Sequence, residues 1–178
     1  MACLKKILVI GTSGSGKSTL AKKIALKLDL PYCPTDRFYW KKDWQPEPSD
    51  RVREKAYDFA TQPEWVMDGN FDSDRDIVWK EADCILWLNY PRLTVLYRVL
   101  SRNLRWWVTQ EEIWSGNRMT LKHAISGIRH AMRSYGKKKR DYPLWLKDYE
   151  TVVVFRSSRQ ALKWMKKLSG QGLTLSVP

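Results

Sequence analysis

The sequence predicts an α/β fold in which a five-stranded parallel sheet is flanked by helices. Short apolar segments alternate with helical patterns along the 178 residues, and this alternation is typical of βα units. The expected strands are residues 7–10, 30–36, 64–70, 83–89 and 151–155. The length fits a single domain that has a full hydrophobic core.

A phosphate-binding loop follows the first strand. Residues 7–10 read ILVI, a run rich in β-branched side chains, and residues 11–19 read GTSGSGKST. The second segment has the Walker A pattern G-x-x-x-x-G-K-S, which predicts a P-loop NTPase fold. A Gly- and Ser-rich linker is the alternative, and it is disfavoured because a strand precedes the loop and a helical pattern follows it.

The loop pattern predicts that the protein binds ATP with Mg²⁺. Lys17 is expected to reach the β- and γ-phosphates, and the Ser18 hydroxyl to ligate Mg²⁺. Backbone N–H groups and the start of the following helix supply the remaining positive potential. The expected nucleotide-binding residues are Gly11, Thr12, Ser13, Gly14, Ser15, Gly16, Lys17, Ser18 and Thr19.

The other elements follow from capping and periodicity. Residues 37–48 are aromatic, charged and interrupted by proline, which predicts a loop. Helices are expected at 49–61 and 91–105, and a less regular helical region at 106–149 with an amphipathic helix at about 118–135. Ser157 or Ser158 caps a last helix that ends near residue 168, and the tail after it is expected to be loose.

Two acidic residues follow strands at the edge where ligands bind in parallel sheets. Asp68 ends the third strand and is expected to serve Mg²⁺ or to position an acceptor, although an ordinary turn aspartate before glycine is the alternative. Asp36 ends the second strand and could accept the proton of a substrate hydroxyl or hydrogen-bond the substrate. A helix-capping or loop acid is the alternative for Asp36.

An arginine stripe lies on the helix expected at 91–105. Arg98, Arg102 and Arg105 share one face, and Leu93, Leu96, Leu100 and Leu104 lie on a roughly opposite one. Guanidinium groups match phosphate oxygens, so Arg98 and Arg102 are expected to stabilise charge during phosphoryl transfer. For Arg105, a place on a solvated helix face without a functional role is an equally good interpretation.

The positive charge is confined to the second half of the chain. The net charge of +13 arises entirely from residues 91–178, because residues 1–90 contain equal numbers of acidic and basic side chains. The densest stretch, residues 118–140, contains no acid and predicts a polyanionic ligand, which could be a nucleotide, a phosphorylated substrate or nucleic acid. Its basic residues are Arg118, Lys122, Arg129, Arg133, Lys137, Lys138, Lys139 and Arg140.

Several other residue types carry weaker information. Trp106, Trp107 and Trp114 could stack on a base, but they are more simply interpreted as a clamp between the helical region and the body. The three cysteines show no C-x-x-C spacing and suit buried, reduced thiols in a cytosol. No segment is long and apolar enough to cross a membrane, so a soluble, cytoplasmic protein is expected.

Taken together, five segments resemble the adenylate-kinase-related P-loop proteins called DNA topology modulation proteins. The resemblance covers residues 4–168 and rests on GTSGSGKST, PTDRFYW, VMDGNF, LWLNYPRLTVLYRVLSRNLR and FRSSRQALKWM. It implies a nucleoside-phosphate kinase fold with a substrate-binding segment at 37–62 and a lid at 105–149. By similarity Lys17 and its loop bind ATP, Ser18 and Asp68 serve Mg²⁺, Arg98 and Arg102 contact phosphates as the lid closes, and Arg156 lines the adenine pocket.

The sequence also departs from true adenylate kinases. Those proteins have Asp-Gly-Phe-Pro-Arg after the third strand, whereas this chain has DGNFDSDR, which puts Asp72 in the position of the arginine that binds the monophosphate. This departure argues against AMP as the acceptor. Asp36 is similar to the acid that small-molecule kinases such as shikimate kinase use to bind a hydroxyl. The fourth strand ends in Asn89 rather than an acid, so an ATPase motor fits poorly.

Two classes of function are therefore expected. The first is a kinase that transfers the γ-phosphate of Mg·ATP to a nucleotide, nucleoside or hydroxyl metabolite, with Lys17, Asp36, Arg98 and Arg102 as catalytic residues. The second is a nucleotide-switched protein that binds nucleic acid through residues 118–140.

Overall fold

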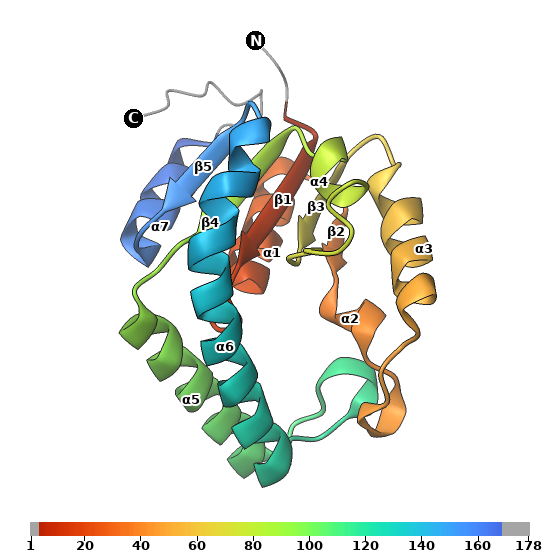
Figure 1. Ribbon diagram of the computed structural model, residues 1–178, viewed down its shortest axis with the longest axis vertical. Coiled ribbons are helices and arrows are strands. Elements are labelled where there is room, and N and C mark those ends of the chain that lie inside the picture. The colour runs from red at the N-terminus through yellow and green to blue at the C-terminus, as the bar shows by residue number, and fades with distance from the viewer. Residues whose placement is uncertain (1–3, 169–178) are drawn as a thin grey trace.

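The computed structural model describes residues 4–168, and it confirms the five-stranded parallel sheet (Figure 1). The strand order is β2-β3-β1-β4-β5, and every neighbouring pair is parallel. The strands are β1 (Lys6–Gly11), β2 (Tyr32–Pro34), β3 (Trp65–Asp68), β4 (Cys84–Leu88) and β5 (Val152–Phe155).

Helices cover both faces of the sheet and extend beyond its carboxyl edge. The α-helices are α1 (Lys17–Leu28), α2 (Asp36–Tyr39), α3 (Ser49–Ala60), α4 (Val78–Glu81), α5 (Arg92–Thr109), α6 (Leu121–Trp145) and α7 (Ser158–Lys167). Three short 3-10 helices complete the described chain: η1 (Lys42–Trp44), η2 (Trp114–Gly116) and η3 (Leu146–Asp148). Among the described residues, no helix combines the length and the hydropathy that a bilayer span requires.

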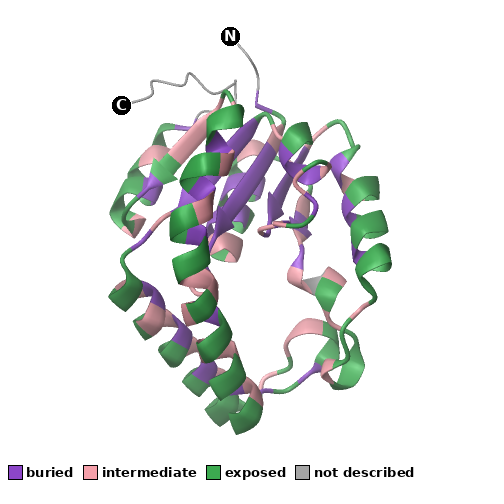
Figure 2. Ribbon diagram, in the orientation of Figure 1, coloured by how far each residue is buried: buried purple, intermediate pink, exposed green. Residues whose placement is uncertain are grey.

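The central strand β1 supplies both hydrophobic cores because successive side chains point to opposite faces. Ile7 and Val9 pack with α1, α5 and α7, whereas Leu8 and Ile10 pack with α3, α4 and the end of α6. All four side chains are fully buried, and Figure 2 shows the central strands of the sheet in purple, whereas the edge strand β5 is partly exposed. In the sheet register Val9 pairs with Asp68 and Gly11 pairs with Leu88. The loop after β1 therefore begins at the same edge of the sheet at which β3 and β4 end.

The segment after the second strand is more ordered than the sequence predicts. The strand expected at 30–36 is limited to Tyr32–Pro34, and Asp36 begins the short helix α2 instead of ending the strand. The expected loop at 37–48 contains most of α2 and all of η1. The prediction of a loop holds for residues 40–41 and 45–48 but missed the two short helices. Local sequence does not reveal that contacts with the lid order this segment, as described below.

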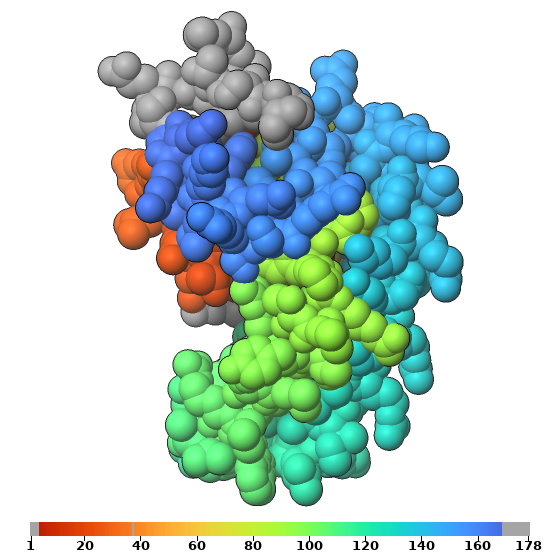
Figure 3. Space-filling model, turned by 90° about the vertical axis from the view of Figure 1, so that its left-hand side faces the viewer, coloured from red at the N-terminus to blue at the C-terminus, as the bar shows by residue number. Residues whose placement is uncertain are grey.

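The lid region is also more regular than expected. Residues 106–149 contain the end of α5, η2 and a continuous 25-residue helix, α6, which replaces the helix expected at 118–135. Thr120 caps α6 by accepting a hydrogen bond from the His123 amide, and Pro143 lies near the end of the helix. Figure 3 shows α5 in green with α6 in cyan beside it.

The expected apolar stripes are only partly buried. On α5 the side chains that pack inward are Val95 and Val99, and Leu93, Leu100 and Leu104 are exposed. On α6, Ile128 and Met132 pack against the core, whereas Leu121 and Ile125 are exposed. The leucines opposite the arginine stripe are therefore not the buried face of α5, because the smaller valines pack against the P-loop, as described below.

The substrate-binding segment and the lid meet at their tips. The Trp44 amide donates to Asn117 Oδ1 at 2.8 Å, and Asn117 Nδ2 donates to the Lys41 carbonyl oxygen at 2.8 Å. The Trp44 ring stacks on His123 with centroids 4.5 Å apart and meets Trp114 edge-on. These contacts close a ring of elements from β2 through η1 to α6, and they support the interpretation of Trp114 as a clamp.

Candidate active site

The P-loop is shaped by glycines that no other residue could replace without strain. Gly14 has φ +81°, and a Cβ built on it would lie 2.3 Å from Val99 Cγ2, so α5 packs directly on the loop. Gly16 has φ +93° and is the N-cap of α1, where it offers no side chain to cap the first turn. The amide groups that begin α1 are therefore oriented to bind an anion.

A buried hydroxyl inside the loop fits the same anion. Within the described part of the chain, Ser15 Oγ is the buried side-chain oxygen or nitrogen that lacks a hydrogen-bond partner. An unsatisfied buried polar group is costly and is usually explained by a ligand, water or ion. The loop glycines, the uncapped start of α1 and Ser15 together fit the phosphates of a nucleotide.

Lys17 lies in a desolvated position between carboxylates. Its ammonium donates to the Thr12 carbonyl oxygen at 3.3 Å. Burial lowers the pKa of Lys17, and the negative charges of Asp36 and Asp68 oppose this shift. The negative charge of a bound polyphosphate would stabilise the charged form of such a buried lysine.

Ser18 and Asp68, the two expected metal-binding residues, are in contact. The Ser18 hydroxyl donates a short hydrogen bond to Asp68 Oδ2, and the Tyr32 hydroxyl donates to Asp68 Oδ1 at 3.0 Å. Thr35 Oγ1 donates to the Asp68 carbonyl oxygen. Burial raises the pKa of Asp68, although the hydrogen bond from Ser18 and the charge of Lys17 oppose the increase. A buried carboxylate beside a hydroxyl and a phosphate loop fits the hard oxygen ligands that Mg²⁺ prefers.

Asp36 acts electrostatically on residues of the loop and of the lid helix. It is half-buried at the start of α2, and its charge acts on the pKa values of Lys17, Tyr39 and Arg102. These groups come from the loop, α2 and α5, so Asp36 lies within electrostatic range of both the phosphate site and the lid helix.

Two of the three stripe arginines reach the loop. Arg98 donates to the Ser15 carbonyl oxygen at 3.1 Å and to Ser158 Oγ at 2.5 Å. Arg102 Nη2 donates to Ser13 Oγ at 3.4 Å, and burial lowers the pKa of Arg102. Arg105 instead pairs at the surface with Glu111 at 2.8 Å.

Three further residues expected to bind the nucleotide differ in their burial and hydrogen bonds. Thr12 is buried, and its carbonyl oxygen accepts the Ser15 amide at 3.0 Å, whereas Thr19 on α1 is exposed. Arg156 is exposed, and its backbone N–H donates to Gln160 Oε1 at 2.7 Å. The assignment of Arg156 to an adenine pocket stays a prediction.

Sequence reasoning missed a polar cluster beside the loop. Lys138 Nζ lies 2.8 Å from Asp72 Oδ2, and the Tyr142 hydroxyl donates to Asp72 Oδ1 at 2.7 Å. Asn70 Oδ1 accepts the Gly11 amide at 2.9 Å. The replacement of the adenylate-kinase arginine by Asp72 could have indicated that this position has a basic partner. Nothing in the sequence distinguishes Lys138 from its neighbours in the run of four basic residues at 137–140.

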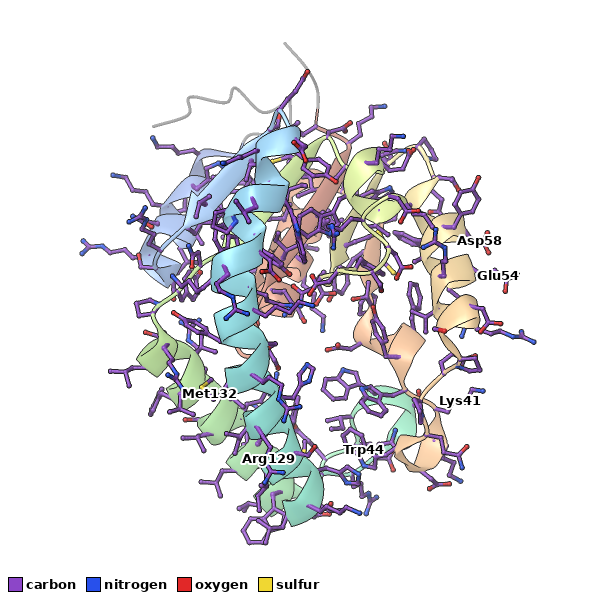
Figure 4. All side chains as sticks on the ribbon, viewed as in Figure 1. Lys41, Trp44, Glu54, Asp58, Arg129 and Met132 are labelled. Carbon is purple, nitrogen blue, oxygen red and sulfur yellow. The ribbon has the colours of Figure 1, made fainter. Side chains whose placement is uncertain are left out.

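The remaining basic residues lie mostly on the outside of α6. Arg118 pairs with Glu112 at 3.3 Å, and Lys138 is buried. The exposed members are Lys122, Arg129, Arg133, Lys137, Lys139 and Arg140. In Figure 4, Glu54 and Asp58 project outward from α3, away from α6.

Comparisons with known proteins identify the fold. No family model matches the sequence, and no curated protein matches it. The structure is similar to shikimate kinase from Acinetobacter baumannii in complex with shikimate, with a TM-score of 0.54, 14% identity, and 92% of each chain covered. It is also similar to a gluconokinase from Sinorhizobium meliloti 1021, with a TM-score of 0.54, 16% identity, and 95% of each chain covered. The protein therefore has the fold of the P-loop kinases.

Proposed function

We propose that the protein is an ATP-dependent kinase that transfers the γ-phosphate of Mg·ATP to a small hydroxyl-bearing acceptor. The observation that carries this proposal is the convergence of Lys17, Asp36, Asp68 and Arg102, whose charges act on one another beside the phosphate loop. Phosphoryl transfer requires little more than positioning and charge neutralisation, and these groups supply both.

The residues have distinct roles in the proposed reaction. The acceptor oxygen attacks the γ-phosphorus, the bond to the β–γ bridging oxygen breaks, and ADP leaves. Asp36 accepts a hydrogen bond from the acceptor hydroxyl and takes its proton, while Lys17 and Arg102 stabilise the charge on the transferred group. Ser18 and Asp68 would hold Mg²⁺, which neutralises the β- and γ-phosphate oxygens when bound.

The structural neighbours support an acceptor that is a small molecule. Their names describe kinases of shikimate and gluconate, and the aspartate at the start of α2 suits recognition of a hydroxyl. The resemblance to DNA topology modulation proteins remains part of this proposal. A cytoplasmic location is part of this proposal, because the proposed reaction uses ATP and the buried thiol of Cys84 suits a reducing compartment.

The test is ATP consumption with Mg²⁺ against a panel of nucleoside monophosphates, nucleosides and hydroxyl metabolites. Lys17→Ala serves as the blank, and Lys23→Ala, on the exposed side of the same helix, is the matched control. We expect one class of acceptor to stimulate the wild type and Lys23→Ala, and Lys17→Ala to be slower by orders of magnitude. Fast hydrolysis without any acceptor, or near-normal turnover in Lys17→Ala, would contradict the proposal.

A second candidate function is nucleic-acid binding through α6, and the exposed basic side chains of that helix favour it. Binding of this kind weakens steeply with salt. The affinity of a duplex oligonucleotide should then fall when Lys137, Lys139 and Arg140 are replaced by glutamine. A flat salt response would exclude this candidate and leave the kinase unaffected.

A further inference from the structure

We propose that Asp72 determines the class of acceptor, because its ion pair with Lys138 restricts the acceptor to hydroxyl compounds that carry no phosphate or carboxylate group. The inference rests on the proposed function, since it specifies the acceptor of that reaction.

Both oxygens of Asp72 are engaged by groups of α6. Oδ2 lies 2.8 Å from Lys138 Nζ, and Oδ1 accepts the Tyr142 hydroxyl at 2.7 Å. The Lys138 side chain is only 9% exposed, and its ammonium also lies 5.2 Å from the centroid of the Tyr142 ring. A pair that is this buried and geometrically satisfied is not easily separated, because removing one partner would leave an uncompensated charge.

Lys138 lies beside the phosphate loop. Its charge acts on Lys17, and Lys138 lines a small pocket between the loop and α6 together with Thr12, Asn89 and Tyr135. A free ammonium here would attract a phosphate or a carboxylate next to the γ-phosphate of ATP. Asp72 cancels that charge.

The basic side chains that contact the loop differ from Lys138 in their hydrogen-bond partners. Beside the loop, Arg98 and Arg102 donate to neutral oxygens of Ser15 and Ser13, so neither forms a hydrogen-bonded ion pair there. On α3, Arg53 forms a more exposed example of a cation held by carboxylates: Nη1 lies 2.8 Å from Asp74 Oδ1 and Nη2 lies 2.7 Å from Asp76 Oδ2. Lys138 has the same kind of partner in Asp72.

The pKa of Tyr39 reflects the electrostatic potential near the start of α2. Burial and the charges of Asp74, Asp36 and Asp72 raise the pKa of Tyr39 to about 12. Three carboxylates from the start of α2 and from the segment after β3 therefore act on one hydroxyl of α2. Asp72 and Asp74 are paired with Lys138 and Arg53, so the uncompensated negative charge near Tyr39 is that of Asp36, which disfavours an anionic acceptor but not a polyol or an amine.

The first experiment compares acceptors that share a skeleton but differ in charge. Glucose, gluconate and glucosamine form one set, and adenosine and AMP form another; the readout is acceptor-stimulated ATP consumption. We expect the neutral or amine member of a set to have the higher kcat/KM. A higher kcat/KM for the acidic member overturns the inference and leaves the kinase proposal standing.

The second experiment does not depend on knowing the acceptor. Ribose 5-phosphate is titrated calorimetrically into protein saturated with Mg²⁺ and a non-hydrolysable ATP analogue, using the wild type, Asp72→Asn and Asp76→Asn. Asp76→Asn is the matched control because Asp76 also binds a basic side chain but is 63% exposed. We expect Asp72→Asn to bind ribose 5-phosphate at least about tenfold more tightly than the other two proteins, because Lys138 is then free to pair with the phosphate. Equal affinity in all three proteins overturns the inference.

A further variant covers the case in which Asp72→Asn does not fold. Lys138→Met removes the cation and leaves Asp72, so glucosamine should bind more tightly than to the wild type and ribose 5-phosphate no more tightly. Unchanged binding of glucosamine, or a gain for ribose 5-phosphate, overturns the inference. Failure of the wild type to bind the ATP analogue would instead contradict the proposed function.

Discussion

The Ser18 hydroxyl at the start of α1 donates a hydrogen bond to Asp68 Oδ2 at the end of β3. This contact joins the phosphate loop to the neighbouring strand end, where a metal ion bound to ATP phosphates would lie. We predict that Asp68→Asn lowers Mg²⁺-dependent turnover by about 100-fold or more, because an essential anionic ligand is lost. The measurement is the Mg²⁺ concentration dependence of kcat.

A matched pair of hydroxyl variants controls for changes in the helix itself. Ser18→Ala should also lower Mg²⁺-dependent turnover. Thr19→Ala, at the exposed next position of α1, should behave as the wild type. Equal effects of the two substitutions would show that the contact with Asp68 has no special role.

Arg102, which contacts the phosphate loop, and Arg105, which lies at the surface, should differ in their effect on kcat. Arg102→Ala should reduce kcat by about 100-fold, since a desolvated charge beside the loop is removed. Arg105→Ala should change kcat little, because Arg105 forms an exposed ion pair with Glu111. Steady-state kinetics of the two variants check this prediction, and a similar loss in both would contradict it.

Asn117 should control the contact between the lid and the substrate-binding segment. It is buried, accepts the Trp44 amide and donates to the carbonyl oxygens of Lys41 and Trp114. Asn117→Ala should cost about 1–3 kcal/mol, since buried backbone groups lose their partner, and should raise KM for the acceptor. The neighbouring Arg118→Ala is the control, because its exposed pair with Glu112 contributes little. Thermal melts and acceptor KM values test the pair, and an unchanged Asn117→Ala would argue against closure through these tips.

Cys84 should be unreactive in the folded protein. Burial raises the pKa of its thiol from 9.0 to about 12. The raised pKa favours the protonated form in the fold, so this contribution to stability is present below pH 9 and is lost as the pH rises towards 12. Peptide mapping after iodoacetamide treatment at pH 8 should find Cys84 modified only when the protein is denatured first. Rapid modification of Cys84 under native conditions would contradict its burial.

The parts of the fold that the sequence predicts are those encoded by local patterns. The run at residues 7–10 is rich in β-branched side chains, and the glycine spacing of the loop is specific, so β1 and the start of α1 were recognisable. The proximity of Asp68 to the phosphate loop could be expected from the sequence, because the carboxyl ends of parallel strands meet at one edge, and in the structure Asp68 accepts a hydrogen bond from Ser18.

The errors arise where distant segments determine the structure. Val95 and Val99, rather than the leucines, face inward on α5, because Val99 packs on Gly14. The pairing of Lys138 with Asp72 joins residues 66 positions apart, and no periodicity within either segment indicates it. Similarly, η1 depends on Asn117, which lies 73 positions from Trp44.

The transfer of labelled γ-phosphate from ATP tests the central claim most directly. The protein is incubated with Mg²⁺, radiolabelled ATP and each acceptor of the panel, and the products are separated. The account predicts that the label appears in an organic phosphate ester with the wild type and Lys23→Ala, and that Lys17→Ala forms almost none. Label found only in inorganic phosphate, or an equal yield of ester with Lys17→Ala, would contradict it.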